Sequence, residues 1–234
     1  PEIFVTGDIV TFGDQAANTA VNISEDLSPD TLIVHSSKAY TFSGNGAIVA
    51  GSLVKQGSGT LTLSGDHSYT GGNYLKGGVV KVSALSNENK ATGNLGGVTT
   101  QASKFTMEGG ATLQTTAAVT NGSPIRLVGE EGGIISNAAD FNQNKAFSGT
   151  QLTKTGGGWL KTYVTGASLA KMVIAAGTVQ NMNGIAAKTI EFQGGTLVDN
   201  VGTNNTLTVP EKKKGTWTTA NRADYSNKIT GEGE

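Results

Sequence analysis

Apolar and polar residues alternate with a period of two in short runs along the chain, and glycine-rich turns separate these runs. In the clearest stretch, residues 52–83, the runs 53–55 and 60–63 flank the turn 57–59, and the run 79–82 follows a second glycine pair. Such alternation is typical of strands with one buried face, and glycine suits corners that need positive φ. The stretch therefore predicts strand, tight corner and strand.

Comparable runs follow one another through the first fifty residues. We expect strands at 3–12, 20–23, 31–34, 40–43 and 47–49, with breaks at clusters of glycine, proline, asparagine and aspartate. A strand or corner roughly every 8 to 12 residues is typical of an all-β sandwich, barrel or solenoid. Spacing alone does not separate these architectures.

Internal repetition favours the solenoid. Residues 53–82 align without a gap on residues 152–181, at an offset of 99 positions. Seven positions recur: Leu53, Lys55, Gly57, Gly59, Leu61, Gly78 and Val80 return as Leu152, Lys154, Gly156, Gly158, Leu160, Gly177 and Val179. A sandwich gives no reason for a unit to return in register, whereas the coils of a solenoid stack like side chains on like.

A second phrase places an apolar pair two residues apart before a glycine pair. It occurs at 105–110 and 190–195, with a looser copy at 125–135, and we expect its glycines to form corners. Coils of about 20 to 25 residues would give on the order of ten coils, and a rod ~50 Å long at the usual spacing of neighbouring strands. We therefore predict a parallel β-helix, with an antiparallel β-sandwich as the alternative.

Composition agrees with an ordered all-β chain. The 34 glycines among 234 residues disfavour helices, while the 36% of hydrophobic residues fall in alternating runs that can bury a thin, continuous core. The 17 basic and 18 acidic side chains nearly cancel, so nucleic acid is not indicated as a partner, nor is a basic membrane-binding patch. No long apolar window predicts a transmembrane helix.

The termini and the missing cysteine bear on where the protein works. The chain begins with Pro1, and residues 228–234 resemble the start of a further repeat, so we expect residues 1–234 to be one solenoid domain within a longer chain. The first residues lack the charged start and apolar run of a signal peptide. The absence of cysteine suits a chain that crosses a membrane unfolded, with chance as the alternative explanation.

The segments KQGSGTLTLSG (55–65), YTGG (69–72) and GVVKV (78–82) resemble the autotransporter-associated β-strand repeat, also called the passenger-associated transport repeat. The best repeat spans 53–83. The copy at 152–182 is degenerate, because Ser168-Leu169-Ala170-Lys171 replaces YTGG. The resemblance implies a right-handed parallel β-helix in a bacterial cell-surface or secreted protein, anchored at the outer membrane in its full-length form or released. It implies no catalytic residues.

Two classes of function remain open. The first is a non-enzymatic passenger or stalk segment, an adhesin-like scaffold that presents other parts of the protein. The second is a carbohydrate-active β-helix, which binds a polysaccharide or cleaves it as a lyase or hydrolase. Expected partners are host or cell-surface glycans or proteins, together with end-to-end self-association through exposed strand edges. We assign no catalytic, cofactor-binding or metal-binding residue and expect no cofactor.

Individual residues that could carry chemistry have simpler explanations. Asp66-His67 could orient a general base or bind a metal, but it lies in a glycine-rich turn without a nucleophile motif. His35 is expected near the end of a strand. Glu130 and Glu131 are adjacent, so a strand would point them in opposite directions, and a solvated loop is the better interpretation.

Other charged groups are equally open to a structural interpretation. Asp8 with Asp14, or Glu25, Asp26 and Asp30 together, could form a loose calcium cluster, although the calcium-binding nonapeptide of some solenoids is absent. Arg126 is expected to point outward from a strand, and 212–214 to form a basic loop. Because Lys55 and Lys154 belong to the repeat, we expect them to cap its glycine turn.

Aromatic side chains are the candidates for carbohydrate contact, because they can stack on sugar rings. If one strand continues through both positions, Trp159 and Tyr163 lie on the same face. Packing between coils is the alternative role for the whole set, which comprises Tyr69, Tyr74, Trp159, Tyr163, Trp217 and Tyr225. Asn-x-Ser/Thr triplets, the pattern of N-glycosylation sites, begin at Asn22, Asn121 and Asn204, and they are expected by chance in so polar a chain.

Overall fold

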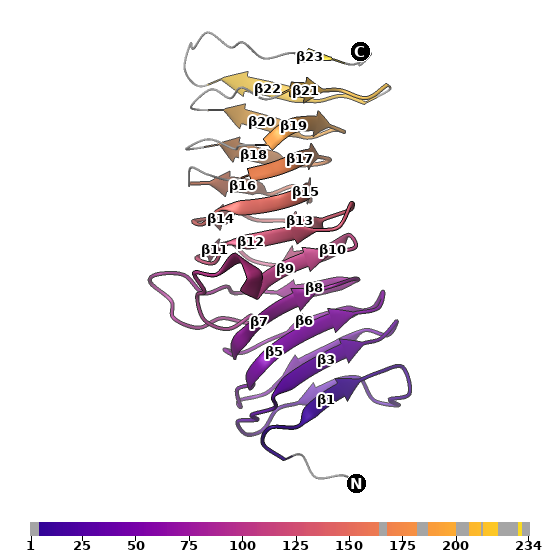
Figure 1. Cartoon of the computed structure of the whole chain (residues 1–234), viewed down its shortest axis with the longest axis vertical. Helices are drawn as coiled ribbons and strands as arrows, with labels where there is room; N and C mark the ends of the chain where they lie inside the picture. Colours follow the sequence, from indigo (N-terminus) through magenta and orange to yellow (C-terminus); the bar gives the residue numbers. More distant parts are fainter. Residues whose placement is uncertain are drawn as a thin grey trace.

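The chain forms a β-solenoid of about ten coils, seen in a computed structural model that describes residues 5–163, 168–181, 187–199, 206–211, 213–219 and 229–230. Figure 1 shows the coils stacked along one axis, with β1 near one end and β22 near the other. In the described part, the only helix is the short 3-10 helix η1 (Ala102–Lys104). The β-helix prediction is confirmed.

Three faces surround the axis. The first face contains β1 (Ile9–Phe12), β3 (Thr31–His35), the second halves of β5 (Val49–Gln56) and β7 (Ser68–Leu75), β9 (Phe105–Glu108), β12 (Ile125–Val128) and the starts of β15 (Phe147–Thr155), β17 (Ser168–Ile174) and β19 (Ala187–Phe192). The second face contains β2 (Ala20–Asn22), β4 (Tyr40–Ser43), β6 (Thr60–Leu63), β8 (Val79–Val82), β10 (Ala111–Thr115), β13 (Gly133–Asn137), the ends of β15, β17 and β19, then β21 (Thr206–Thr208) and β23 (Ile229–Thr230). The third face contains β11 (Val119–Asn121), β14 (Phe141–Gln143), β16 (Trp159–Thr162), β18 (Thr178–Asn181), β20 (Thr196–Asp199) and β22 (Thr216–Thr219).

Neighbouring coils pair in parallel register. Leu32 stands beside Leu53 and Leu53 beside Asn73, so one coil takes about 20 residues there. Every pairing between named strands of the described part is parallel, which rules out the antiparallel sandwich. Because β15 runs round a corner, its start pairs with β12 and its end with β13, and this joins the first two faces into one sheet.

The core is a column of stacked apolar side chains inside the coils. In β6, Leu61 and Leu63 point inward and are fully buried, while the alternating Thr60 and Thr62 are half-buried. On the third face a single ladder runs Val119, Phe141, Leu160, Val179, Leu197 and Trp217. The alternation in the sequence therefore has the predicted cause, since one side of each strand faces this column.

The first expected strand is shorter than its pattern indicates. Residues 5–8 form a turn, in which the backbone N–H of Val5 donates to Oδ2 of Asp8 at 2.9 Å, and β1 begins only at Ile9. The remaining residues of the expected strand, 3–4, lie outside the described residues, as do residue 228 and residues 231–234. Short polar side chains such as aspartate compete with strand pairing by binding local backbone groups.

The two sequence copies occupy different faces, which corrects the expectation that they stack directly. The ladder of Leu53 continues through Asn73, Phe105 and Ile125 to Phe147. The second copy at 152–155 instead pairs with β13 on the second face. The copies therefore repeat a corner and its flanking strands, and the unit is rotated by one face between them.

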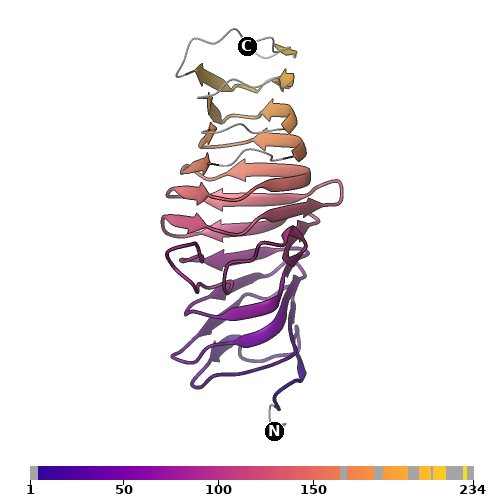
Figure 2. The same ribbon diagram turned by 60° about the vertical axis from the view of Figure 1, so that its left-hand side comes forward.

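The segment between β8 and β9 interrupts the regular stack. It projects from the left side of the rod in Figure 1, and in Figure 2, where that side is turned forward, it lies across the front of the rod. Residues 83–104, here called the insertion loop, take the place of a third-face strand between β7 and β11. Its length increases the sequence separation between paired residues on the first face, where Asn73 pairs with Phe105 in the next coil. The loop thereby adds a segment outside the regular stack of coils.

Candidate functional site

The repeated corner contains a buried lysine. Nζ of Lys55 donates to the carbonyl oxygens of Gln56 at 2.7 Å, Gly57 at 3.0 Å and, in the next coil, Gly77 at 3.3 Å. Nζ of Lys154 donates to the carbonyl oxygens of Thr155 at 2.6 Å, Gly156 at 2.7 Å and Ala176 at 3.3 Å. Each lysine therefore ties its own corner to the corner of the following coil, which confirms the predicted capping role.

Glycine in the next coil makes room for each ammonium group. A Cβ on Gly78 would lie 2.8 Å from Nζ of Lys55, and a Cβ on Gly177 would lie 2.8 Å from Nζ of Lys154. Both glycines also have positive φ, 64° and 70°. The lysine and the glycine recur together in the sequence because they pack against each other across two coils.

Burial lowers the pKa of Lys55 and of Lys154 to about 8 in both corners. Neither side chain has solvent exposure, and the three carbonyl oxygens compensate the ammonium charge only with dipoles. The corners are therefore sites of structure rather than of anion binding, since each ammonium proton is already directed at the backbone.

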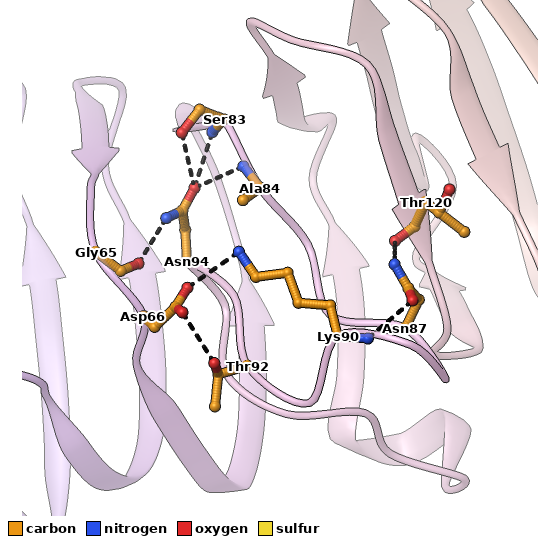
Figure 3. Close-up of polar contacts among 9 residues, drawn as sticks. All are labelled: Gly65, Asp66, Ser83, Ala84, Asn87, Lys90, Thr92, Asn94 and Thr120. Atoms are coloured by element: carbon orange, nitrogen blue, oxygen red, sulfur yellow. Dashed lines mark hydrogen bonds and ion pairs between the residues drawn. The ribbon is translucent and has the colours of Figure 1, made fainter.

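The Asp66-His67 pair anchors the insertion loop (Figure 3). Oδ1 of Asp66 forms an ion pair with Nζ of Lys90 at 3.3 Å, and Oδ2 accepts from Oγ1 of Thr92 at 3.0 Å. The backbone N–H of His67 donates to the carbonyl oxygen of Gly93 at 3.0 Å. Asp66 therefore binds the loop through its side chain, whereas His67 binds it through its backbone.

His67 is held as a neutral ring. Its Nδ1 accepts from the backbone N–H of Ile48 at 3.1 Å, and the ring packs edge-on against Tyr69 with 6.1 Å between centroids. Burial lowers the pKa of His67, although hydrogen bonding and the charge of Asp66 oppose the shift. An unprotonated Nδ1 that already accepts a backbone hydrogen bond has no capacity left to act as a base at that atom.

Asn94 is the centre of the loop and was not identified from the sequence (Figure 3). Its Oδ1 accepts from the backbone N–H groups of Ser83 and Ala84, each at 2.8 Å, and its Nδ2 donates to the carbonyl oxygen of Gly65 at 2.6 Å. At the far side of the loop, Nδ2 of Asn87 donates to the carbonyl oxygen of Thr120 at 3.4 Å. The sequence signal for this loop is the long stretch after Val82 in which apolar and polar residues do not alternate.

A cavity of about 230 Å³ lies between the insertion loop and the body of the rod. Exposed residues Thr70, Gly97 and Val98 form its rim. Buried side chains from three elements and the loop form its deeper wall: Tyr69, Asn73, Leu95, Phe105, Asn121 and Ser123. It combines hydrogen-bonding and apolar groups, which is the usual composition of a ligand pocket.

The acidic residues considered as calcium ligands accept hydrogen bonds from different parts of the chain. Asp14 accepts from Oγ of Ser36 at 2.5 Å and from the backbone N–H of Ser37 at 2.8 Å, whereas Asp8 accepts from Val5. These hydrogen bonds, led by that from Ser36, lower the pKa of Asp14 to about 2. Asp26 accepts from the backbone N–H of Ala47 in the next coil.

These contacts leave no clustered carboxylates for calcium. Among the residues that the structure describes, no group of three or more His, Asp or Glu is close enough to hold a metal ion. Glu25 is exposed, and Asp30 accepts from the hydroxyl of Thr31. Glu130 and Glu131 are exposed in the turn between β12 and β13, and His35 ends β3, as predicted.

The basic residues named from the sequence lie at the surface. Arg126 points outward from β12, as predicted. Lys213 and Lys214 are exposed after a turn in which the N–H of Lys213 donates to the carbonyl oxygen of Pro210, while residue 212 lies outside the described residues. The corner lysines are thus the buried ones among the basic residues singled out.

The aromatic residues divide into buried and exposed groups. Trp159 and Tyr163 remain 39% and 37% exposed on the third face, with Nζ of Lys161 lying 5.6 Å from the centroid of the Trp159 ring. Tyr69 is buried, Trp217 packs against the core, and Tyr74 is half-buried. Both residues therefore keep an exposed part, although Oη of Tyr163 also donates to Oδ1 of Asn142 in the preceding coil at 3.4 Å. Residue 225 lies outside the described residues.

The asparagines of the Asn-x-Ser/Thr triplets differ in their exposure. Asn22 is exposed in β2, whereas Asn121 is buried, with Nδ2 donating to Oε1 of Gln143 at 2.8 Å. Residue 204 lies outside the described residues.

None of the described segments is a helix long and apolar enough to cross a membrane.

Comparison with known proteins agrees with the fold and the repeated corner. The passenger-associated-transport-repeat family matches residues 53–82. The adhesin BmaC autotransporter of Brucella suis biovar 1 (strain 1330) is 30% identical over 161 residues, which cover 67% of this chain and 4% of that relative. No solved structure matches the chain. With its parallel coils and its lysine-capped corners, the chain is a repeat protein of the autotransporter passenger type.

Proposed function

We propose that the chain is a rigid, non-enzymatic spacer in a bacterial passenger that is exposed at the cell surface or secreted. The observation that carries this proposal is the unbroken column of core side chains, which links coil to coil from β1 to β22. Because each coil packs directly on its neighbours, a solenoid of this kind is a rod without a flexible joint, and it keeps its two ends at a fixed distance. Its work is to hold other parts of the protein away from their anchor.

Likeness to an adhesin autotransporter supports the surface location and an adhesin-like role. The chain spans a small fraction of that relative, so adhesion by the whole protein is part of the proposal. Surface display of the 234-residue chain between an outer-membrane anchor and a terminal epitope tests it. The epitope should be accessible to antibody on intact cells, and deleting whole coils should bring it measurably closer to the membrane. Intracellular retention would contradict the proposal.

Carbohydrate binding is a second candidate, and one observation favours it. Trp159 and Tyr163 lie exposed on the third face, about 13 Å apart along the extended chain. Exposed aromatic rings are the usual stacking surface for sugars. Screening neutral and acidic glycans for binding and cleavage tests both candidates. Binding lost in Trp159→Ala supports the second, and cleavage would contradict the non-enzymatic proposal.

Self-association through the ends of the rod is the partner interaction we propose. Val10, Phe12 and Val21 lie partly buried at the β1 end, and β1 pairs only with β3 among the described strands. Unpaired strand edges next to apolar side chains favour stacking of a second copy. Sedimentation velocity should show association that increases with concentration and decreases in Val10→Lys. A monomer at all concentrations would contradict it.

A further inference from the structure

Residues 90–94 of the insertion loop bind to one short segment, residues 65–67, here called the anchor turn (Figure 3). Three side chains of the loop contact polar groups of the anchor turn, and these are Lys90, Thr92 and Asn94. A fourth contact is the hydrogen bond from the backbone N–H of His67 to the carbonyl oxygen of Gly93 at 3.0 Å. The position of this part of the loop therefore depends on the position of the anchor turn.

The side chain of His67 holds the anchor turn on the preceding coil. Its Nδ1 accepts from the backbone N–H of Ile48 at 3.1 Å, and the backbone N–H of Ser68 donates to the carbonyl oxygen of Ile48 at 2.8 Å. Only 1% of the surface of His67 is exposed, so the ring is shielded from solvent. His67 thus connects the two parts, since its ring binds the preceding coil and its backbone N–H binds the loop.

Acid adds a proton at the atom that makes this contact. Because Nδ1 of His67 is an acceptor, the hydrogen of the neutral ring is on Nε2, and a second proton can bind only at Nδ1. A protonated Nδ1 is a donor, and in the present arrangement it would face the N–H donor of Ile48. The closed arrangement therefore requires the neutral ring, whereas the charged ring favours a position in which water reaches it.

Other titratable groups lie on the elements packed against His67. The carboxylate of Asp66 favours the charged ring, but it is also paired with Lys90 of the loop. Burial raises the pKa of Tyr69 on β7, so its phenol stays neutral in acid. Two coils before the anchor turn, Asp26 accepts a hydrogen bond from the backbone of the preceding coil. Burial nevertheless lowers the pKa of His67, so desolvation outweighs the attraction of Asp66.

We propose that His67 is a pH switch, which keeps residues 90–94 of the insertion loop docked while its ring is neutral and releases them when the ring is protonated. Release exposes apolar side chains next to this segment, because Leu95 and Phe105 line the cavity under the loop and are buried in the closed form. The switch adds a conformational response to the rod, and the spacer role does not depend on it.

The direction of the pH effect follows from the two forms of the loop. In the closed form the pKa of His67 is below its ordinary value of 6.5, and in the open form the solvated ring regains that value. The open form therefore binds the proton more tightly. As the pH falls below 6.5, the opening equilibrium should increase by up to about tenfold per pH unit, until the pH passes below the pKa of the closed form.

Amide hydrogen exchange of the 15N-labelled chain, followed by NMR between about pH 4.5 and 7.5, tests the proposal. Each rate is divided by the intrinsic exchange rate at the same pH, so that the quotient reports opening alone. The quotient should increase in acid for the amides of Ile48 and His67, which lose their acceptors on release, and stay constant in β15 and β17. A quotient at Ile48 and His67 that does not change with pH would overturn the proposal.

His67→Asn removes the switch but keeps the contact. Its Oδ1 can accept from the N–H of Ile48 and does not titrate, so the exchange quotient of Ile48 should lose its pH dependence, whatever its level. His35→Asn is the matched control, because His35 is exposed at the end of β3, and it should respond to pH like the parent chain. A pH dependence that persists in His67→Asn would refute the switch.

Asp66→Asn separates the histidine from the ion pair with Lys90, which acid also weakens once an aspartate takes up a proton near its ordinary pKa of about 3.9. This variant should keep the response below pH 6.5. A response that is lost in Asp66→Asn and kept in His67→Asn would assign it to the ion pair and overturn the proposal.

NMR titration of the His67 ring in the parent chain needs neither variant to fold. The ring should carry its hydrogen on Nε2 at neutral pH and have a pKa below 6.5. A pKa of 6.5 or above, or a hydrogen on Nδ1, would also overturn the proposal.

Discussion

Lys154 stands one face further round the coil than Lys55, although the two residues make the same contacts. Lys154 pairs with Ile135 in a ladder that descends through Leu113 and Val80 to Leu61. Lys55 lies in the separate ladder that runs from Val34 to Leu75. The repeated corner therefore occurs at two places around the axis, between the first and second faces at Lys55 and between the second and third faces at Lys154.

Removing either corner lysine should destabilise the rod. Lys55→Met should cost about 1–2 kcal/mol, because three carbonyl oxygens lose their donor and the relief of a buried charge offsets only part of that loss. Lys81→Met, on the outer side of the same repeat, should stay within about 0.5 kcal/mol of the parent. Urea unfolding followed by circular dichroism measures both. A Lys55→Met chain as stable as the parent would contradict the capping role.

The buried lysines should also make stability increase with pH. Their folded pKa is about 8 and their ordinary value is 10.5, so the unfolded chain holds these protons more tightly. Below pH 8 the buried charges lower stability by a constant amount. Between pH 8 and 10.5 the folded chain has released protons that the unfolded chain still binds, so stability rises by at most about 1.4 kcal/mol per pH unit for each lysine.

The matched comparison for this pH effect is the double variant Lys55→Met with Lys154→Met. Urea midpoints measured at several pH values across that window should rise less steeply in the double variant than in the parent. Other titrating groups are common to both chains and cancel in the difference. Parallel curves for the two chains would show that the lysines do not titrate in this window.

Gly78 should tolerate no side chain. Gly78→Ala forces alanine into positive φ and drives its Cβ against the carbonyl oxygen of Gly57, so we expect a loss of roughly 2 kcal/mol or more. Gly77→Ala is the control, because its Cβ would meet nothing closer than 3.5 Å. Thermal unfolding of both variants checks the difference, and equal stability would contradict the packing of glycine on lysine.

Asn94 should control the insertion loop more strongly than Asp66 does. Asn94→Ala removes hydrogen bonds to Ser83, Ala84 and Gly65 and should cost about 1–3 kcal/mol. Asp66→Asn weakens an ion pair with Lys90 whose side chains are 50% and 44% exposed, so its effect should stay below about 1 kcal/mol. Trypsin should cleave after Lys90 faster in Asn94→Ala. Equal cleavage rates in the two variants would contradict this order.

The coils of residues 53–83 should be the most protected part of the chain, because their alternation is the most regular. We expect the slowest amide hydrogen exchange across Leu61, Leu63, Val80 and Val82, which are all buried. Mass spectrometry of exchanged peptides measures it. Slower exchange in another part of the rod would contradict this prediction.

The sequence by itself determined the architecture. Alternation of residues such as Thr60-Leu61-Thr62-Leu63 specifies which side of each strand is buried, and the recurrence of lysine with glycine specifies the corner, because both features depend on residues close together in the chain. It also indicated correctly that Asp66-His67 lies in the break between two strands, β6 and β7.

Only the tertiary structure decided how the units are placed around the axis. The rotation between the two copies depends on the summed length of every intervening coil and loop, which a local pattern does not encode. For the same reason, the sequence did not show that Asn94 ties the insertion loop to Gly65, or that residues of β7, the insertion loop and β11 meet at one cavity. Those residues are brought together by stacking between coils, and their contacts exist only once the coils have formed.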